Sequence, residues 1–327
     1  MRIFDSTQLD KVQKGGVVSI GNFDGVHLGH QDILRTARQV RPGVPLSVMT
    51  FEPHPAAILH PQKTPGVLSP LPMKTRLLEQ LSVDQLIVIT DCIKLLNLSP
   101  KEFVDEFLIK TLAPFAVVEG PNFNFGYGRS GGIETLKTLG KERGFEVCEV
   151  PYRQIHLDPD RRSVICSSSL IRRLLEQGEV HHAAAALGRP YRLAGKTIPG
   201  RGIGRQLGFP TANIQPENQI LPTEGVYAGF VMAGRTLEEV CGRGVRRPAA
   251  ISIGRAKTFM TDHPMLIEAH ILEPNVEDLR DKYLAMDFIE CIRRQQRFEN
   301  RQFLIEQIDK DCKKVLEILD KAVDNRI

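Results

Sequence analysis

The stretch that decides the fold of the first half reads Gly21-Asn22-Phe23-Asp24-Gly25-Val26-His27-Leu28-Gly29-His30. An apolar run at residues 17–20 precedes it and helical spacing begins at about Gln31, so the sequence predicts a strand, a glycine-rich loop and a helix. Such glycines let backbone N–H groups approach an anion, and the start of the helix adds a positive dipole end. We therefore predict a phosphate site in which His27 and His30 donate hydrogen bonds to phosphate oxygens.

Taken alone, these residues leave two other interpretations open. Turn glycines beside two surface histidines would show the same short spacing. A metal site would need a third ligand, and none is evident nearby in the sequence.

Five short apolar runs alternate with segments of helical spacing in the first half. They lie at residues 17–20, 46–51, 85–89, 115–118 and 146–150. This alternation predicts an α/β domain, in which crossover helices connect the strands of a parallel sheet. Ligands of such sheets bind beyond the carboxyl ends of the strands, so we expect the chemistry in the loops at residues 21–30 and 120–132.

The amino-acid composition changes near residues 183–190, and the second half of the chain is rich in glycine and proline. Its strand-like runs at residues 226–232, 249–253 and 266–272 predict a small antiparallel β-barrel. A C-terminal helix is predicted by an apolar stripe that consists of Leu304, Ile308, Cys312, Val315, Leu319 and Val323. We place the domains at residues 1–185 and 186–327.

Composition narrows the class of protein. The 327 residues are 42% hydrophobic and 25% charged, which suits two packed cores. No apolar run approaches the roughly 20 residues of a membrane span, and the start lacks a secretory signal, so we expect a cytoplasmic protein without a membrane partner. A net charge of +4 does not indicate nucleic acid, and we expect small-molecule partners and a monomer or weak homo-oligomer.

Longer motifs decide between the interpretations of the histidine loop. The string GNFDGVHLGH resembles the signature of the HxGH nucleotidyltransferases, and in this form it resembles the FAD synthetase part of bacterial bifunctional riboflavin kinase/FAD synthetases. The segments TFEPHP at 50–55, NFNFG at 122–126 and SSSLIR at 167–172 match further parts of that family in order. The resemblance implies a Rossmann-like domain that adenylylates FMN to FAD with release of pyrophosphate.

The resemblance also implies roles for individual residues of this domain. Catalysis falls to His27 and His30. The implied ATP-binding residues are Gly21, Asn22, Phe23, Asp24, Gly25, Gly29, Ser168, Ser169 and Arg172, of which the last three would open a helix. A plain Ser-capped helix would show the same short segment. The implied flavin-binding residues are Asn122, Phe123, Phe125 and Arg129.

This chain departs from the family's pattern in the flavin loop. Asn122 replaces a usual Asp, and Gly132 stands where an acidic residue is common. Both changes remove negative charge, so we expect altered binding rather than lost chemistry.

The second half resembles the riboflavin kinases. The glycine-rich residues 195–205 would fit a flexible flap over phosphates, although any mobile loop could look the same, and they are followed by PTAN at 210–213 and GVYAG at 225–229. The resemblance implies ATP-dependent phosphorylation of riboflavin to FMN, with Glu268 of the segment EAHIL as the base. The implied ATP-binding residues are Gly195, Lys196, Gly204, Pro210, Thr211 and Asn213, with Thr211 and Asn213 as Mg²⁺ ligands.

The region expected around the flavin departs from the kinase pattern at residues 252–259, 272–274 and 279–281. Two alternatives follow. The protein could be an FMN adenylyltransferase only, with a degenerate kinase domain as a flavin-binding module. It could also be another HxGH enzyme that acts on a different phosphate monoester, but that alternative leaves the PTAN half unexplained.

Overall fold

The computed structural model describes residues 1–59, 66–157, 163–200, 202–255, 265–274, 276 and 278–324. The chain forms two compact units. The N-terminal unit comprises Met1–Pro65, Lys74–His156 and Ser163–Cys166, and the C-terminal unit comprises Gly66–Met73, Leu157–Arg162 and Ser167–Ile327. The functional boundary between residues 185 and 186 stays a prediction.

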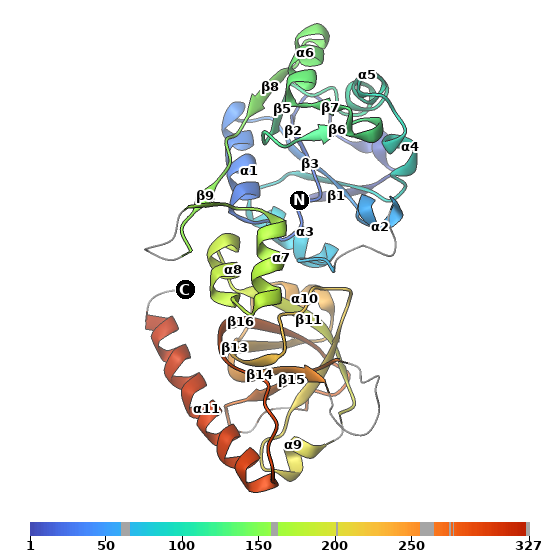
Figure 1. Cartoon of the computed structure of the whole chain (residues 1–327). Helices are drawn as coiled ribbons and strands as arrows, with labels where there is room; N and C mark the ends of the chain where they lie inside the picture. Colours follow the sequence, from blue (N-terminus) through green and yellow to red (C-terminus); the bar gives the residue numbers. More distant parts are fainter. Residues whose placement is uncertain are drawn as a thin grey trace. The chain divides into compact units, whose positions relative to one another are not determined.

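A six-stranded parallel sheet forms the centre of the N-terminal unit (Figure 1). Its strands, in spatial order, are β1 (Arg2–Asp5), β4 (Gln85–Ile89), β3 (Leu46–Phe51), β2 (Val17–Ile20), β5 (Ala116–Glu119) and β8 (Glu146–Glu149). The five predicted runs are confirmed to within one residue at either end. The strand order runs outward in both directions from the β2 and β5 pair, which makes their carboxyl ends the switch point where ligands bind in such sheets.

Helices cover the sheet of the N-terminal unit on both faces. They are α1 (Leu28–Val40), α2 (Pro55–Leu59), α3 (Leu71–Gln80), α4 (Ile93–Leu96), α5 (Pro100–Glu102), η3 (Phe103–Leu112) and α6 (Ile133–Arg143), with the short turns η1 (Leu9–Lys11) and η4 (Tyr127–Arg129). The main core joins Val18, Met49 and Ile87 of the sheet to Phe107 of η3 and Leu136 of α6. Two small hairpins complete the unit: β6 (Asn124–Phe125) with β7 (Gly131–Gly132), and β9 (Gln154–Ile155) with β10 (Val164–Ile165).

The C-terminal unit contains the predicted antiparallel barrel, which is closed and has six strands. In spatial order these are β11 (Tyr191–Ile198), β12 (Ala212–Pro216), β15 (Met265–Ile271), β14 (Arg247–Arg255), β13 (Gly225–Gly234) and β16 (Tyr283–Arg294). The unit's helices are α7 (Ser168–Gln177), α8 (Val180–Leu187), α9 (Ile203–Gln206), α10 (Leu237–Cys241) and α11 (Arg301–Asp324).

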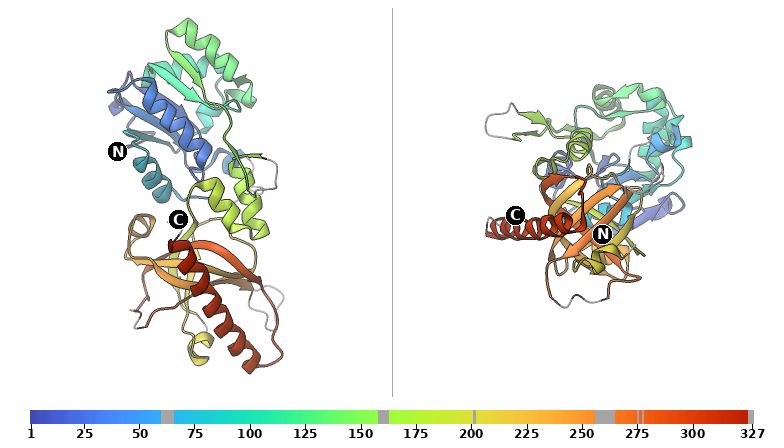
Figure 2. Two further views of the ribbon diagram at one scale, coloured as in Figure 1. Left: turned by 90° about the vertical axis from the view of Figure 1, so that its left-hand side faces the viewer. Right: turned by 60° about the horizontal axis from the view of Figure 1, so that its bottom comes forward.

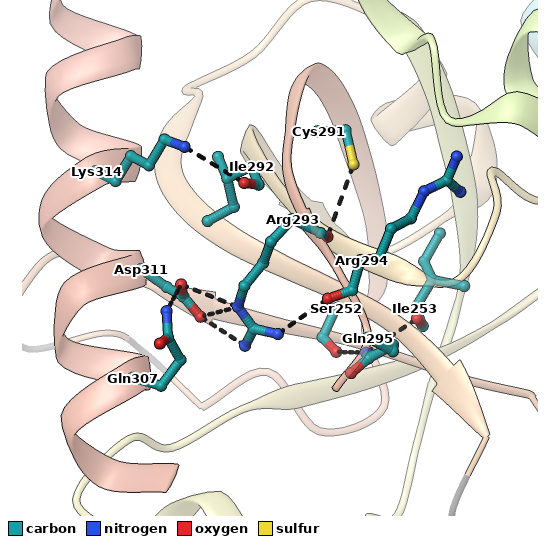
Figure 3. Close-up of polar contacts among 10 residues, drawn as sticks. All are labelled: Ser252, Ile253, Cys291, Ile292, Arg293, Arg294, Gln295, Gln307, Asp311 and Lys314. Carbon is teal, nitrogen blue, oxygen red and sulfur yellow. Dashed lines mark hydrogen bonds and ion pairs between the residues drawn. The ribbon is translucent and has the colours of Figure 1, made fainter. Parts of the chain in front are cut away.

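Helix α11 lies along the outside of the barrel (Figures 1 and 2). Val315 and Leu319 of the predicted stripe are buried, and they pack against barrel residues that include Val226 and Ile292. Figure 3 shows Arg293 at the end of β16 reaching Asp311 of α11, with Nε and Nη2 donating to the carboxylate at 2.9 and 2.7 Å. Gln307 donates to the same carboxylate at 2.8 Å, so one buried acid ties the helix to the strand.

Candidate active sites

The two histidines of the predicted phosphate loop lie together at the start of α1. Their rings stack with centroids 3.7 Å apart, and Nδ1 of His27 accepts a hydrogen bond from the backbone N–H of His30 at 3.4 Å. His27 is thus the N-cap of α1, which begins three residues earlier than predicted and includes Gly29 and His30. A Cβ on Gly29 would lie 3.2 Å from the His27 ring, so glycine makes room for the stack.

The loop between β2 and α1 has a strained backbone. Phe23 and Val26 have φ values of 47° and 41°, and Gly25 has a φ of 82°. A left-handed conformation is costly for a bulky or β-branched residue and is found where the surrounding structure imposes it, often at functional sites. Phe23 is buried and its ring packs on His30 at 5.1 Å, so its predicted role in ATP binding can rest only on its backbone.

Buried polar groups surround the histidine pair. Nζ of Lys74 donates to Oγ1 of Thr50 at 3.4 Å, and that hydroxyl donates to the carbonyl of Asn22 at 3.1 Å. Burial lowers the pKa of Lys74, although the charges of Asp24 and Glu52 oppose this effect. The pKa of His30 is held well below 6.5, mainly by burial and further by the neighbouring His27 and Lys74. His30 is therefore a neutral imidazole at neutral pH.

A buried glutamate lies at the switch point between β2 and β5. Glu119 ends β5, and its carboxylate accepts hydrogen bonds from the backbone N–H of Ile20 and from Oγ of Ser19 on β2. Burial raises the pKa of Glu119 well above its usual 4.5. This contact joins the two strands whose carboxyl ends carry the two predicted loops.

The predicted flavin loop of the N-terminal unit folds as the β6 and β7 hairpin. Phe123 and Phe125 stack at 5.5 Å, and Phe125 is buried against Phe103. Asn122 and Arg129 are exposed, and Arg129 has a φ of 60°. Phe125 therefore anchors the hairpin, whereas Asn122 and Arg129 are accessible to a ligand.

The segment SSSLIR opens α7, as predicted. Oγ of Ser167 caps the helix by accepting from the N–H of Leu170 at 3.2 Å, and Ser168 and Ser169 form the first turn. Nε of Arg172 donates to the Gly66 carbonyl at 3.3 Å. These residues belong to the C-terminal unit, and their predicted contact with ATP stays a prediction.

In the barrel, the candidate residues Asn213 and Glu268 form a row with Ser252 across neighbouring strands. Asn213 of β12 is the Cα partner of Glu268 on β15, and Glu268 is the Cα partner of Ser252 on β14. Partners in antiparallel strands point to the same face. The buried neighbours of Glu268, Ile267 and Ala269, point to the opposite face, so this row lies on the outer wall of the barrel.

The loop before β12 packs closely on the predicted metal ligands. A Cβ on Gly200 would lie 2.4 Å from Nδ2 of Asn213, and one on Gly204 would lie 3.2 Å from Oγ1 of Thr211. Nδ1 of His270 lies 2.8 Å from the Pro210 carbonyl, so His270 donates to it and fixes the residue before Thr211. These contacts bring Thr211, Asn213 and Glu268 into one region.

The prediction of a flexible flap at residues 195–205 was wrong for its first residues, which form a strand. Gly195 and Lys196 belong to β11, where Gly195 pairs with Pro216 on one side and Leu284 on the other. A Cβ on Gly195 would lie 2.2 Å from the Gln215 carbonyl oxygen, so this glycine serves strand packing. Residues 256–259 of the departing flavin region lie outside the described residues.

A hollow of about 480 Å³ opens between α9 and the beginning of α11. Its walls are formed by Ile203, Gln206, Leu207, Phe298, Asn300, Arg301 and Leu304. Nη2 of Arg301 donates to the Gln206 carbonyl at 2.6 Å and so links the two walls. Four of these seven residues are apolar and three are polar, so the hollow offers a mixed surface.

Comparison with known proteins first defines the class. The chain matches the family described as FAD synthetase over residues 9–163 and the family described as riboflavin kinase over residues 187–319. A solved structure described as a macrolide-efflux protein from Streptococcus pneumoniae has a similar fold, with a TM-score of 0.81 and 25% identity over 95% of this chain and 97% of that one. Among the described residues, no helix is long and apolar enough to cross a membrane.

Two relatives cover 91% of this chain and 91% of their own length. Both are called bifunctional riboflavin kinase/FMN adenylyltransferase; the protein of Bacillus subtilis is 35% identical over 309 residues and that of Pseudomonas fluorescens is 34% identical over 300 residues. The chain belongs to the bifunctional riboflavin kinase/FMN adenylyltransferase family.

Sequence reasoning missed several groups that the fold brings to these sites. Lys74 contacts Thr50 beside the histidine loop, and Glu119 contacts the end of β2 that leads into this loop. Thr50 and His270 belong to the segments TFEPHP and EAHIL, but the sequence indicated no role for either. Lys74 and Glu119 have no characteristic spacing, because their contacts bridge residues that are far apart in the chain. Each lies in a segment whose apolar pattern predicts only a helix or a strand, so the sequence does not single it out.

Proposed function

We propose that this protein phosphorylates riboflavin to FMN and adenylylates FMN to FAD, each reaction in its own half of the chain. The observation that carries the proposal is the stacked His27 and His30 pair at the start of α1, directly beyond the carboxyl end of β2. Family membership and the row of Asn213 and Glu268 support the kinase half. ATP and flavins are the substrates.

In adenylylation, a phosphate oxygen of FMN attacks the α-phosphorus of ATP and pyrophosphate leaves. Negative charge builds on the α-phosphate oxygens as the new P–O bond forms. We assign His27 and His30 to donate hydrogen bonds to these oxygens as neutral imidazoles, in accord with the lowered pKa of His30. Lys74 supplies a nearby buried amine that sequence reasoning did not identify.

The start of α1 supplies the other part of this phosphate site. We assign the anion to the loop backbone at Asn22, Asp24 and Gly25 and to the positive end of the helix. The N–H of Gly21 donates to the Met49 carbonyl at 3.0 Å, so Gly21 is assigned to the site only for the close approach that its missing side chain allows. We assign Ser168, Ser169 and Arg172 to the β- and γ-phosphates and the exposed Asn122 and Arg129 to FMN. Because Asn122 carries no charge, it does not repel the FMN phosphate as an Asp would.

In the kinase reaction, the terminal ribityl hydroxyl of riboflavin attacks the γ-phosphorus of ATP and ADP leaves. We assign Glu268 as the base that accepts the hydroxyl proton. The flavin ring is assigned to the hollow beside Phe298. We assign ATP binding in the kinase half to Gly204, Pro210 and the strand residues Gly195 and Lys196.

The residues near Glu268 suit a magnesium ion. Thr211 offers a hydroxyl, Asn213 an amide and Glu268 a carboxylate, and Mg²⁺ prefers such hard oxygen ligands. The absent side chain of Gly200 leaves room for the Asn213 amide. When bound, the ion neutralises charge on the transferred phosphoryl group. We assign Thr211 and Asn213 to hold it.

The proposal is tested by product stoichiometry in two separate assays of the full chain with MgATP. FMN as substrate should give FAD and pyrophosphate in equal amounts, and riboflavin should give an amount of ADP equal to the sum of FMN and FAD. Failure of the first assay removes adenylylation. Failure of the second, with flavin still bound, leaves an adenylyltransferase whose barrel only binds flavin.

A further inference from the structure

Cys166 contacts the first histidine of the proposed adenylylation site. Its Sγ lies 3.6 Å from Nδ1 of His27, and the residue is 5% exposed. The backbone N–H of Cys166 donates to the Arg153 carbonyl at 2.8 Å, which fixes the position of the residue within the N-terminal unit. The contact joins residues that are 139 positions apart in the chain.

The direction of this contact follows from the other partner of the same nitrogen. Nδ1 of His27 accepts from the backbone N–H of His30, and a backbone N–H can only donate. Nδ1 keeps its lone pair while this bond is formed, which favours the neutral ring with its proton on Nε2. At 3.4 Å the bond is too long to fix the tautomer by itself. A second group in contact with Nδ1 can stabilise this tautomer only by donating a hydrogen.

The thiol of Cys166 is able to donate. Burial raises the pKa of Cys166 above its usual 9.0, so the sulfur keeps its proton at neutral pH. Hydrogen bonds with the backbone at Leu28 and Gly29 oppose this rise, which places the sulfur at the N-terminus of α1. The sulfur thus accepts from the start of the helix while its hydrogen is available to the imidazole.

We propose that Cys166 is a positioning residue for FMN adenylylation, whose S–H donates to Nδ1 of His27 and holds the imidazole in the tautomer that carries its proton on Nε2. The stacked His30 ring and the close approach of Gly29 fix the plane of the same imidazole. This inference rests on the proposed function, because the Nε2–H is the donor assigned to the ATP phosphate. Cys166 itself touches no reacting atom.

The direct test is the tautomer of His27, observed by nitrogen-15 NMR of the full chain labelled in its histidines, with the signals assigned by a His27→Gln variant. The wild type should show an unprotonated Nδ1 and a protonated Nε2 near neutral pH. Cys166→Ala should give mixed tautomers and lower kcat for FAD formation by about 2- to 10-fold, the effect of one lost hydrogen bond, with little change in KM. Cys166→Ser, which keeps a donor, should restore both readouts.

Cys92 provides the matched control because it is equally buried in the N-terminal unit. Cys92→Ala should leave the His27 signals unchanged, whatever it does to stability. A wild-type His27 protonated on Nδ1 would overturn the inference, as would a Cys166→Ala variant with unaltered tautomer and kcat, or a Cys166→Ser variant no better than Cys166→Ala. Absence of FAD formation by the wild type would refute the proposed function instead, and the NMR comparison would still decide the role of the thiol.

Discussion

Glu268 on β15 lies directly opposite Asn213 on β12, so the proposed base and a proposed metal ligand are cross-strand neighbours on the outer wall of the barrel. This pairing links the two parts of the kinase proposal. Glu268 is partly buried and Asn213 is buried, which suits groups that act beside a desolvated phosphate.

Substitution of the proposed base should separate the two activities. Glu268→Gln keeps the shape of the side chain but removes the proton acceptor, so FMN formation should fall by about 100-fold or more. FAD formation from supplied FMN should keep its wild-type rate in the same preparation. Glu290→Gln, an exposed strand residue of the same barrel, should leave both rates unchanged. Equal loss of both activities in Glu268→Gln would contradict separate sites.

Gly200 gives a steric test of the proposed metal ligand. The Cβ of Gly200→Ala would come within 2.4 Å of Nδ2 of Asn213 and should displace this amide. We expect kinase kcat/KM for MgATP to fall by about 10-fold or more, the effect of a small misplacement at a reacting group. In an Asn213→Ala background the same change should add little. Full additivity of the two losses would show that Gly200 does not act through Asn213.

Glu119 should make stability depend on pH. Its pKa is raised in the folded state, so folding takes up a proton above pH 4.5, and the stability contributed by Glu119 falls as pH rises toward the folded pKa. Glu119→Gln keeps an acceptor for the Ile20 N–H and removes this loss. Between pH 4.5 and the folded pKa of Glu119, the free energy of unfolding of Glu119→Gln should rise relative to that of the wild type by up to about 1.4 kcal/mol per pH unit. Urea unfolding at pH 5 and 8 measures it, with the exposed Glu146→Gln as control. A difference independent of pH would contradict the argument.

The Arg293 and Asp311 pair should hold α11 on the barrel. Their side chains are 18% and 7% exposed, so Asp311→Ala leaves a largely buried guanidinium without its carboxylate and should cost about 3 to 5 kcal/mol. Arg293→Met combined with Asp311→Leu should recover much of that loss. Asp309→Ala breaks an exposed pair with Lys313 on the same helix and should cost less than about 1 kcal/mol. Urea unfolding of the full chain compares the three variants, and equal losses for Asp309→Ala and Asp311→Ala would refute the role of the buried pair.

Four of the five strands predicted in the first half are almost fully buried, and the fifth, β8, is a partly exposed edge strand. The run at 17–20 is buried throughout, whereas β1 (Arg2–Asp5) is an edge strand with Arg2 and Ile3 exposed, and its sequence carries no comparable signal. Strand β11 was missed for another reason. Its glycine at 195 resembles a loop residue, although the close approach of β12 requires it.

The candidate adenylylation site was predictable from the sequence where its residues come from one short segment of the chain. His27 and His30 lie three residues apart in one short segment, so the sequence brought them together, and the longer motif around them decided in favour of a phosphate site. The beginning of α1 was placed too late because an imidazole is not among the usual N-cap groups. Cys166 and Lys74 reach the loop only through tertiary contacts, which single-chain spacing cannot encode.

The central claim is tested most directly by chromatography of the flavins formed from riboflavin and MgATP by the wild type and by a His30→Ala variant. We predict that the wild type forms FMN first and then FAD, while His30→Ala accumulates FMN and makes FAD about 100-fold more slowly. Formation of FAD by His30→Ala at the wild-type rate, or no conversion of FMN by the wild type, would contradict the account.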